Sequence, residues 1–180
     1  MVARPGGDGG RVLVRAPEER DRDAYVALAK RSRRFHAGLA SPARDAAGFA
    51  RLIAAHQRDD YEAFLLVRRQ DDAVMGAIAI SQIFRFSFQS AYLGYWIGAP
   101  YARQGYMKEG LALVLTEAFR RLKLHRLEAN IQPENTPSIR LVRGLGFRLE
   151  GYSPRYLKIG GRWRDHERWA ILREEWSGRA

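Results

Sequence analysis

Residues 91–122 constrain the fold of this chain most, because strand, loop and helix signals follow one another there without interruption. The apolar run AYLGYWIG is typical of a short buried strand, and the loop APYARQGYMKEG after it carries Gly105 near its centre. A helix follows, whose apolar residues are three and four positions apart: Leu111, Val114, Leu115, Ala118, Phe119 and Leu122. This order predicts a β-loop-α unit whose helix packs on a sheet.

The loop before this helix has the features of a phosphate-binding turn. Gly105 lacks the Cβ that would block a close backbone approach, and a helix start offers free amide groups and the positive end of a dipole. These features predict a phosphorylated cofactor. A strand, a glycine turn and a helix also describe ordinary α/β connections, so the rest of the chain has to separate the two interpretations.

Length and composition favour one domain. The chain has 180 residues, 46% of them hydrophobic, which suffices for a core without metals or disulfides. The longest apolar run, residues 73–80, is too short to span a bilayer, and MVARPGGDGG lacks the apolar segment of a signal peptide. We therefore expect a soluble cytoplasmic protein with a disordered tail at residues 1–10 and a domain at residues 11–176.

The cysteine, histidine and charge counts limit which reaction intermediates, metal sites and partners are possible for this chain. The absence of cysteine excludes disulfides, thiolate metal sites and a covalent intermediate on a thiol. The histidines show no metal-ligand spacing, so no metal is predicted: His36, His56, His125 and His166. The formal net charge of +11 attracts nucleotides, acidic peptides or ribonucleoprotein. The basic residues accompany no recognised nucleic-acid motif, so charge alone names no partner.

Turn and periodicity signals order the N-terminal half. Residues 11–16 alternate like a strand, and Pro17 is expected to open a helix through about Ala29. Apolar residues indicate a second helix: Phe49, Leu52 and Ile53. Residues 63–68 and 74–82, joined by the polar turn QDDA, predict an antiparallel hairpin, and AYLGYWIG adds a third strand.

The stretch IFRFSFQS links the hairpin to the third strand. Its aromatic residues alternate with polar ones: Phe84, Phe86 and Phe88. Such alternation allows the three rings either to continue the sheet or to face a substrate. We predict that they continue the sheet.

The C-terminal half repeats the β-α pattern and ends in a hairpin. Residues 126–131 alternate with Leu127, Ala129 and Ile131 facing inward, and Asn135 stands at a helix cap before TPSIRLVRGLGF. Glycines end that helix, a strand starts at Phe147, and a final hairpin turns at Gly160 and Gly161. The whole order predicts an α/β (α+β) fold: one domain with a mixed, mostly antiparallel sheet flanked by helices.

Taken in this order, the elements resemble the GNAT acetyltransferase superfamily over residues 12–172. The motifs LGYWIG, PYARQGYMKEGL, HRLEANIQPENTPSIRLVRGLGF and EGY followed by YLKIGGRWRDH are similar to the RimJ/RimL branch, the ribosomal-protein-alanine N-terminal acetyltransferases, with the RimJ type closest. The resemblance implies acetyl-coenzyme A (acetyl-CoA) as cosubstrate. Ala102 and Met107 depart from the superfamily's phosphate loop, which usually has Arg or Gln and Gly or Ala there, and Arg103 or Lys108 is expected to supply the missing charge.

The resemblance also implies the site residues. The backbone of Tyr95, Trp96 and Ile97 is expected beside the pantetheine arm. Loop amides are expected on the pyrophosphate: Arg103, Gln104, Gly105, Tyr106, Met107 and Lys108. Asn135 and Ser138 match the family's Asn-x-x-Ser pattern, with Asn on the pantetheine side and Ser placed to protonate the leaving thiolate. Asn135 also suits a helix cap, and Ser138 a first helical turn, so both interpretations stay open.

A general base cannot be carried over, because the glutamate of the RimL type corresponds to Leu157. Glu150, Asp165 and His166 are candidates, although charged residues beside the turn at residues 160–161 are more often structural. A peptide α-amine has a pKa of about 7.7 to 8.0, so part of it is neutral near pH 7.5 and a water relay suffices. Without cysteine, the simplest scheme is direct attack in a ternary complex.

Three functions follow from this reasoning. We favour acetylation of a protein N-terminal amine, on a ribosomal protein. The second keeps the chemistry with a small acceptor, namely a polyamine, an aminoglycoside or an amino acid. A cationic acceptor requires an acidic pocket, and one tight acidic cluster lies beside the central strands: Asp59, Asp60 and Glu62. The third is a non-catalytic module that binds ribosomes or RNA through its positive surface.

Overall fold

The computed structural model describes residues 10–39 and 42–178 and shows one seven-stranded sheet in the order β1-β2-β3-β4-β5-β7-β6. The strands are β1 (Val12–Arg15), β2 (Tyr61–Arg68), β3 (Val74–Phe84), β4 (Ser90–Ile97), β5 (Arg126–Ile131), β6 (Arg148–Ile159) and β7 (Arg162–Leu172). All neighbouring pairs are antiparallel except β4 and β5, which run parallel. The predicted mixed, mostly antiparallel fold is confirmed.

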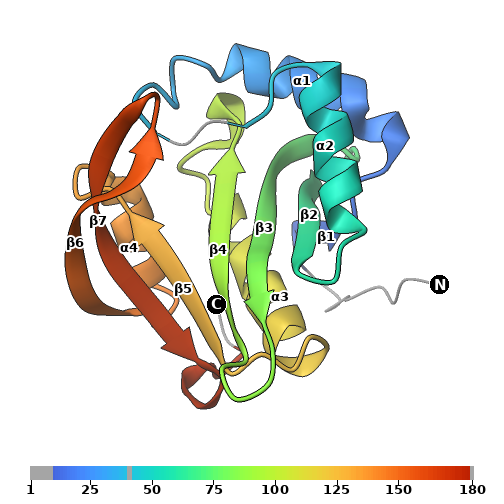
Figure 1. Ribbon diagram of the computed structural model, residues 1–180. Coiled ribbons are helices and arrows are strands. Elements are labelled where there is room, and N and C mark those ends of the chain that lie inside the picture. The colour runs from blue at the N-terminus through green and yellow to red at the C-terminus, as the bar shows by residue number, and fades with distance from the viewer. Residues whose placement is uncertain (1–9, 40–41, 179–180) are drawn as a thin grey trace.

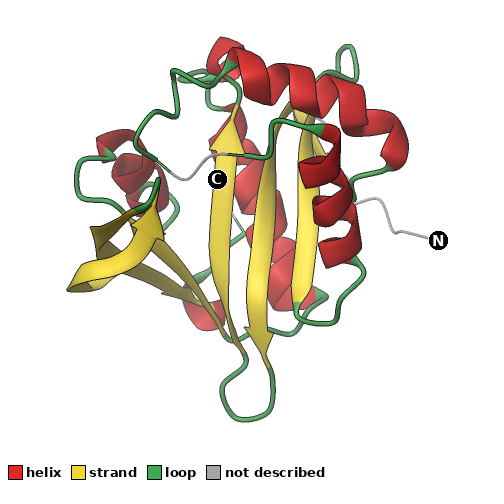
Figure 2. Cartoon of the chain, turned by 45° about the horizontal axis from the view of Figure 1, so that its top comes forward, coloured by secondary structure: helices red, strands yellow, loops and turns green. Residues whose placement is uncertain are grey.

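Within the described residues, four α-helices cover the two faces of the sheet (Figures 1 and 2). They are α1 (Arg22–Arg31), α2 (Ala46–His56), α3 (Tyr106–Arg120) and α4 (Thr136–Arg143). Alternation along β4 separates two cores. Trp96 packs with α1 and α2, whereas Ala91 and Leu93 pack on the opposite face with α3. The predicted apolar stripe of α3 is buried in this second core.

The first helix begins later than predicted. Pro17 is followed by a short 3-10 turn (Glu19–Asp21), and α1 starts at Arg22. A tertiary ion pair holds this turn, because Nη2 of Arg15 on β1 lies 2.6 Å from Oδ1 of Asp21. Pro17 therefore correctly indicated a turn before the helix. The ion pair between Arg15 and Asp21 stabilises that turn, and α1 begins after it.

The phenylalanine stretch departs from the prediction. Phe84 ends β3, but Phe86 and Phe88 lie in the turn before β4. Phe86 is 93% exposed and has a positive φ of 56°, which is incompatible with a strand. The prediction that these rings continue the sheet is therefore wrong beyond Phe84, because the chain has to reverse there to enter β4.

The C-terminal elements agree with the predictions. Asn135 caps α4, and β6 and β7 form the final hairpin, whose turn residues Gly160 and Gly161 both have positive φ. The predicted disordered tail covers residues 1–10, of which residues 1–9 lie outside the described residues. The domain end at residue 176 stays a prediction.

The parallel pair β4 and β5 positions the site. The two strands are paired from Ser90↔Arg126 to Tyr92↔Glu128. Beyond this point β4 stays on β3 as far as Ile97, while β5 stays on β7 as far as Ile131. The strands therefore separate, as Figure 1 shows. We call the opening between residues 93–97 of β4 and 129–131 of β5 the β4–β5 cleft.

Candidate active site

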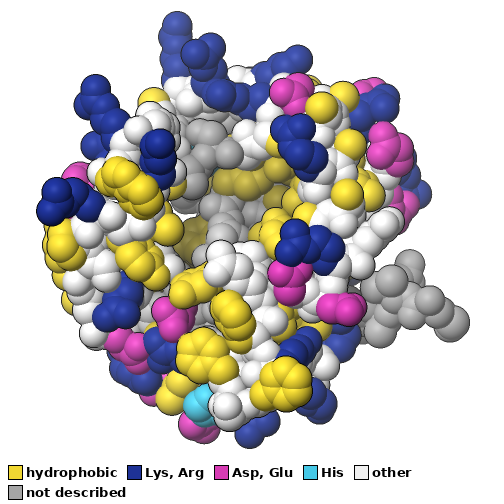
Figure 3. Space-filling view, in the orientation of Figure 1, with side chains coloured by type: hydrophobic (Ala, Val, Ile, Leu, Met, Phe, Trp, Pro, Cys, Tyr) yellow, Lys and Arg dark blue, Asp and Glu magenta, His cyan; other side chains and the backbone are white. Residues whose placement is uncertain are grey.

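The β4–β5 cleft is hollow on the face that carries α1 and α2. Gly94 lies in the middle of a central strand and is nevertheless exposed. In the orientation of Figure 1, the space-filling view of Figure 3 shows a recess near the middle of this face, surrounded by side chains. An exposed glycine in the floor of a sheet leaves room for a ligand to approach the backbone.

The separation of the strands leaves backbone donors of β4 without a strand partner. Gly98 N donates to Met75 O at 2.7 Å, so the amide of Gly98 faces β3. Because amides alternate along a strand, the amide of Trp96 also faces β3, while those of Tyr95 and Ile97 face the cleft. Of the three residues predicted beside the pantetheine arm, the structure thus directs the amides of two into the cleft. The Trp96 ring packs on Tyr25, with their centroids 5.1 Å apart.

The loop before α3 presents a second set of donors. Gly105 is the N-cap of α3 with φ +85°, a conformation that favours glycine. The first helical hydrogen bond runs from Glu109 N to Gly105 O at 3.2 Å. The first-turn amides therefore have no acceptor within the helix and are available to an anion: Tyr106, Met107 and Lys108.

The structure explains why this chain can have Met107 where the superfamily's phosphate loop usually has Gly or Ala. Its side chain is only 7% exposed and belongs to the core beneath α3. The backbone amide at this position is unaffected by where the side chain packs. Arg103, with φ +61°, and Lys108 are exposed and bring positive charge to the loop. The residues present fit a phosphate group.

Arg11 fastens the loop from the outside. Its Nη2 donates to Gln104 O at 3.0 Å, its Nε donates to Oε1 of Glu109 at 2.8 Å, and its guanidinium lies 4.6 Å from the centroid of the Tyr106 ring. In a trans peptide the carbonyl and the next amide point in opposite directions. Holding the Gln104 carbonyl outward therefore directs the Gly105 amide inward. Sequence reasoning missed Arg11, which is distant from the loop in the chain.

Two hydroxyls meet on the α3 and α4 side of the cleft. The Tyr95 hydroxyl and Ser138 Oγ are hydrogen-bonded across 43 residues of sequence. Burial raises the pKa of Tyr95 to about 12, so this phenol is protonated at neutral pH. Asn135 Oδ1 accepts from Ser138 N at 3.4 Å, which confirms the predicted cap. Sequence reasoning had assigned only the backbone of Tyr95, because nothing local links its side chain to Ser138.

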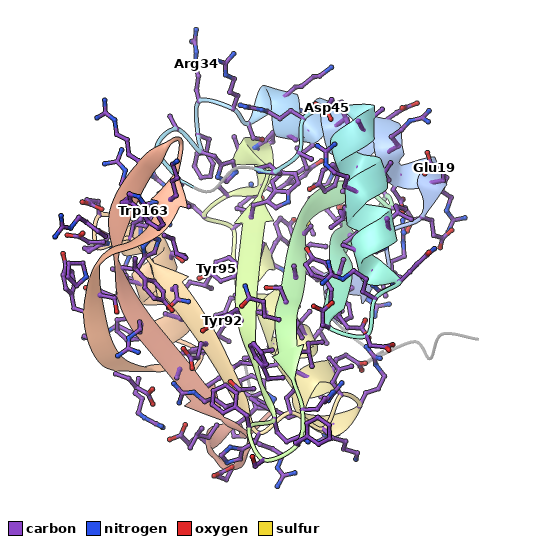
Figure 4. All side chains as sticks on the ribbon, in the orientation of Figure 1. Glu19, Arg34, Asp45, Tyr92, Tyr95 and Trp163 are labelled. Atoms are coloured by element: carbon purple, nitrogen blue, oxygen red, sulfur yellow. The ribbon has the colours of Figure 1, made fainter. Side chains whose placement is uncertain are left out.

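The opposite face of the cleft carries a polar cluster at the point where the strands separate. Tyr92 of β4 lies next to Tyr156 of β6, and Figure 4 shows Tyr92 and Tyr95 between β4 and β5. Burial raises the pKa of Tyr92 to about 12, with further contributions from the Tyr156 hydroxyl and the Glu128 carboxylate. Glu128 Oε1 also accepts from Arg126 Nε at 2.9 Å. The alternation of residues 126–131 could have indicated Glu128, because it faces away from the core.

The three candidate bases named from the sequence are engaged in structural contacts. Glu150 accepts from Arg126 at 3.0 Å, and this hydrogen bond lowers the pKa of its carboxyl group. Asp165 accepts from the Tyr152 hydroxyl and from Arg155 N, which lowers its pKa as well. His166 is 3% exposed, with Nδ1 3.0 Å from Arg164 O. Lowered pKa values make the two carboxylates weaker bases.

The acidic cluster predicted for a cationic acceptor lies at the far end of the sheet. Asp59, Asp60 and Glu62 line a separate recess of about 540 Å³ near the start of β2 and the end of β3. Arg58 pairs with Asp60 at 2.6 Å, and Arg121 pairs with Glu62 at 3.1 Å. The structure does not bring this cluster to the β4–β5 cleft.

A loop after α1 forms a roof over the open end of the cleft. His36 Nε2 donates to Ile97 O of β4 at 2.9 Å, and Ala99 N donates to Ser32 Oγ at 2.9 Å. Gln132, directly after β5, donates through Nε2 to Gly38 O at 3.1 Å. The segment from residue 31 to residue 39, which we call the roof loop, is therefore tied to both walls.

Neither a metal site nor a membrane-spanning helix is found among the described residues. No group of three or more His, Asp or Glu side chains among these residues is arranged to hold a metal ion. In the same part of the chain, no helix is both long and apolar enough to cross a membrane.

A parallel pair of strands that separates beside a helix start rich in free amides defines the acetyl-CoA-dependent acyltransferase class. Residues 11–148 match the family described as Acetyltransferase (GNAT) domain, and the chain belongs to this family. GNAT acetyltransferases use acetyl-CoA, so the predicted cosubstrate is confirmed at the level of the family.

The similar proteins include N-acetyltransferases, one of them acting on a ribosomal protein. The probable N-acetyltransferase YjcK of Bacillus subtilis is 37% identical over 64% of each chain. The [ribosomal protein uS5]-alanine N-acetyltransferase of Escherichia coli is 35% identical over 68% of this chain and 63% of its own length. The match thus spans less than two thirds of these relatives.

Solved structures share the fold across nearly the whole chain. Mycobacterium smegmatis RimJ in complex with CoA-disulfide is 28% identical, with a TM-score of 0.81 over 91% of this chain and 83% of that one. A spermidine N-acetyltransferase from Vibrio cholerae, solved with CoA and spermine, has a TM-score of 0.77 over 92% and 97% of the two chains. At 22% identity this second likeness shows the fold alone.

Proposed function

We propose that this protein transfers the acetyl group of acetyl-CoA to the N-terminal α-amine of a protein, a ribosomal protein being the favoured acceptor. The observation that carries the proposal is the β4–β5 cleft, with amides of β4 on one wall and the Ser138 and Tyr95 hydroxyls beside them. The similarity to the uS5-alanine acetyltransferase supports the acceptor class. A ribosomal-protein acceptor places the reaction in the cytoplasm.

The residues present divide the binding of acetyl-CoA between backbone and loop. The amides of Tyr95 and Ile97 would line the pantetheine arm and donate to the acetyl carbonyl. The amides of residues 103–108 would hold the pyrophosphate, and Asn135 would contact the pantetheine as well as capping α4. Acetyl-CoA supplies an activated thioester.

Ser138 is the proposed proton donor to the departing thiolate. Its hydroxyl is bonded to that of Tyr95, which stays protonated because its pKa is raised to about 12. A donor within reach of the leaving group typically contributes 10²- to 10⁴-fold to the rate. The acceptor amine would attack directly in a ternary complex, and initial-rate lines for the two substrates should intersect rather than run parallel.

Glu128 and Tyr92 are proposed to meet the acceptor amine on the opposite face of the cleft. Glu128 lies in the last register position before the strands separate, directly across from Tyr92. A carboxylate there can hold a water molecule or the amine itself. A peptide α-amine is already partly neutral near its pKa of about 7.7 to 8.0, so this carboxylate need not first deprotonate an ammonium group. The one proton that the attacking nitrogen loses on becoming an amide would pass to this carboxylate or to its water molecule.

The electrostatics of the cleft favour a protein N-terminus over a polyamine. The acidic cluster that a cationic acceptor requires lies at the other end of the sheet and is paired with Arg58 and Arg121. Exposed arginines lie instead on the roof loop, which is tied to both walls of the cleft. Family membership likewise supports an enzyme rather than a non-catalytic ribosome or RNA module.

Thiol release from acetyl-CoA tests the proposal. We would compare peptides with free N-termini, the same peptides with blocked N-termini and an internal lysine, and spermidine. Turnover confined to free N-termini is the expected result. Turnover with spermidine alone would contradict the proposed acceptor, and the absence of turnover with all three would contradict both the N-terminal and the polyamine acceptor.

A further inference from the structure

Two groups of basic side chains flank the mouth of the β4–β5 cleft. The roof arginines belong to the end of α1 and the roof loop: Arg31, Arg33 and Arg34. The hairpin cations belong to β6 and β7: Arg155, Lys158, Arg162 and Arg164. Figure 3 shows Lys and Arg side chains around the upper part of the recess, and Figure 4 shows Arg34 above the loop that follows α1 and Trp163 beside the β6–β7 hairpin. One opening thus separates two groups of like charge.

Neither group is neutralised by an ion pair among the described residues. The carboxylates of this part of the chain that form ion pairs do so with other arginines and histidines, such as Arg15, Arg68 and Arg126. Asp165 is adjacent to the hairpin cations, but its oxygens accept from the Tyr152 hydroxyl and Arg155 N. Like charges across a hollow repel, and an anionic partner between them removes the repulsion.

Arg164 gives an independent sign of a missing acceptor. Its Nε is buried and has no hydrogen-bond partner among the described residues. A buried guanidinium N–H without an acceptor is unfavourable, so Arg164 Nε has a free donor that a ligand can satisfy. Arg164 precedes the buried His166 by two positions on β7, and both therefore face the same side of the sheet.

An exposed aromatic ring accompanies each basic group. Phe35 on the roof loop is 45% exposed, and Trp163 on the hairpin is 61% exposed. Trp163 is paired with Lys158 in the β6–β7 register, so its ring offers apolar surface beside that charge. Double-stranded RNA needs a broad continuous basic face instead, and acidic residues are interspersed with basic ones over the visible surface in Figure 3.

We propose that the acceptor is a protein N-terminus followed by acidic residues, which pair with the roof arginines and the hairpin cations. This inference rests on the proposed N-terminal acetyltransferase function and adds a substrate class to it. An extended chain advances roughly 3.3 Å per residue, so residues two to five of the acceptor, which follow the residue that carries the amine by one to four positions, lie roughly 3 to 13 Å beyond it. The acidic residues are therefore expected at these positions.

The test uses peptides that differ only in charge. Each has the same free N-terminal residue and carries at positions two to five either Asp and Glu, the isosteric Asn and Gln, or Lys. We expect kcat/KM to be about 10-fold higher for the acidic peptide than for its amide counterpart, mainly through KM, and lowest for the lysine peptide. The preference should weaken as salt is raised from 0.05 to about 0.5 M, because exposed charges are screened.

Charge variants localise the effect. The double variant Arg33→Gln and Arg34→Gln should remove most of the acidic preference while the rate on the amide peptide stays unchanged. Lys158→Gln with Arg162→Gln should do the same on the other side. A matched control, Arg120→Gln with Lys123→Gln, removes two exposed charges at the end of α3 and should leave the preference intact.

The outcomes separate this inference from the proposed function. Equal kcat/KM for acidic and amide peptides, or a preference that survives both cleft variants, would overturn the inference and leave N-terminal acetylation standing. Weakened binding of a uridine homopolymer in the cleft variants, without any peptide preference, would assign the surface to RNA. Failure to acetylate every peptide would contradict the proposed function itself.

Discussion

The two ends of β4 belong to one strand and have opposite environments. At the first end, Ser90 and Tyr92 are paired with both β3 and β5, and Ala91 between them is paired with β5. At the other end, β4 is paired with β3 alone, and the amides of Tyr95 and Ile97 face an opening. The paired end stabilises the sheet, and the open end leaves donors that a ligand can satisfy.

This comparison explains where function resides in the molecule. Side chains at the paired end are fixed by packing: Ala91 is 2% exposed and its register partner Leu127 is 0% exposed. At the open end the backbone supplies the proposed contacts, so residue identity matters less there than strand geometry. Substitutions at the two ends should therefore separate stability from catalysis.

The largest expected effect comes from the paired end. Leu127→Ala should lower the free energy of unfolding by about 2 to 5 kcal/mol, because a fully buried leucine leaves a cavity. The KM for acetyl-CoA of the folded variant should stay unchanged. Chemical denaturation measures the free energy of unfolding, and initial-rate kinetics measure the KM for acetyl-CoA. A large rise in this KM with unchanged stability would show that the paired end takes part in binding.

The next effect concerns the hydroxyl pair at the open end. Ser138→Ala should lower kcat about 100-fold, since a positioned proton donor contributes at least this much. Tyr95→Phe should lower it less, because it removes only the partner of Ser138. Thr136→Ala, two positions away and exposed, is the control. If Ser138→Ala keeps its kcat and only loses stability, Ser138 is a helix residue alone.

A smaller effect is expected where Arg11 fastens the phosphate loop. Arg11→Ala should raise the KM for acetyl-CoA about 10-fold with kcat unchanged, because the Gly105 amide loses its fixed direction. The KM for S-acetylpantetheine, which lacks the pyrophosphate, should not change. Arg20→Ala removes a comparably exposed charge remote from the loop and serves as the control. An equal rise in the KM for acetyl-CoA and for S-acetylpantetheine would instead indicate that Arg11→Ala destabilises the protein in general.

The smallest effect involves the roof loop and pH. Burial lowers the pKa of His36, whose neutral ring donates to Ile97 O. The folded state therefore disfavours the protonated ring. The stability contributed by His36 is complete above the unfolded pKa of about 6.5 and is lost as the pH falls through the lower folded value. Unfolding measured at pH 7.5 and 5.5 should show a larger loss for the wild type than for His36→Gln, and equal losses would contradict this role.

The sequence predicted the features that depend on local signals. Gly105 with the amphipathic stripe after it identified the loop and α3, Asn135 identified the start of α4, and the glycines at 160 and 161 identified the last hairpin. Each of these depends on a few neighbouring residues. Local chemistry therefore located both proposed binding elements for acetyl-CoA.

Features that depend on distant contacts could not be predicted in the same way. The Tyr95 hydroxyl meets Ser138 only because β4 and α4 lie together in space, and Arg11 reaches Gln104 and Glu109 only because β1 lies beside the start of α3. The separation of β4 from β5 arises from their partners β3 and β7. The pattern of side chains along one strand does not predict which other strand or helix it will contact.

Residue-resolved amide hydrogen exchange with and without acetyl-CoA tests the central claim most directly. The amides of Tyr95, Ile97 and the first turn of α3 should exchange more slowly when acetyl-CoA is bound, while that of Ala91 should be protected equally in both states. Unchanged exchange at Tyr95 and Ile97, despite saturating acetyl-CoA, would contradict the claim that the open end of β4 holds the cosubstrate.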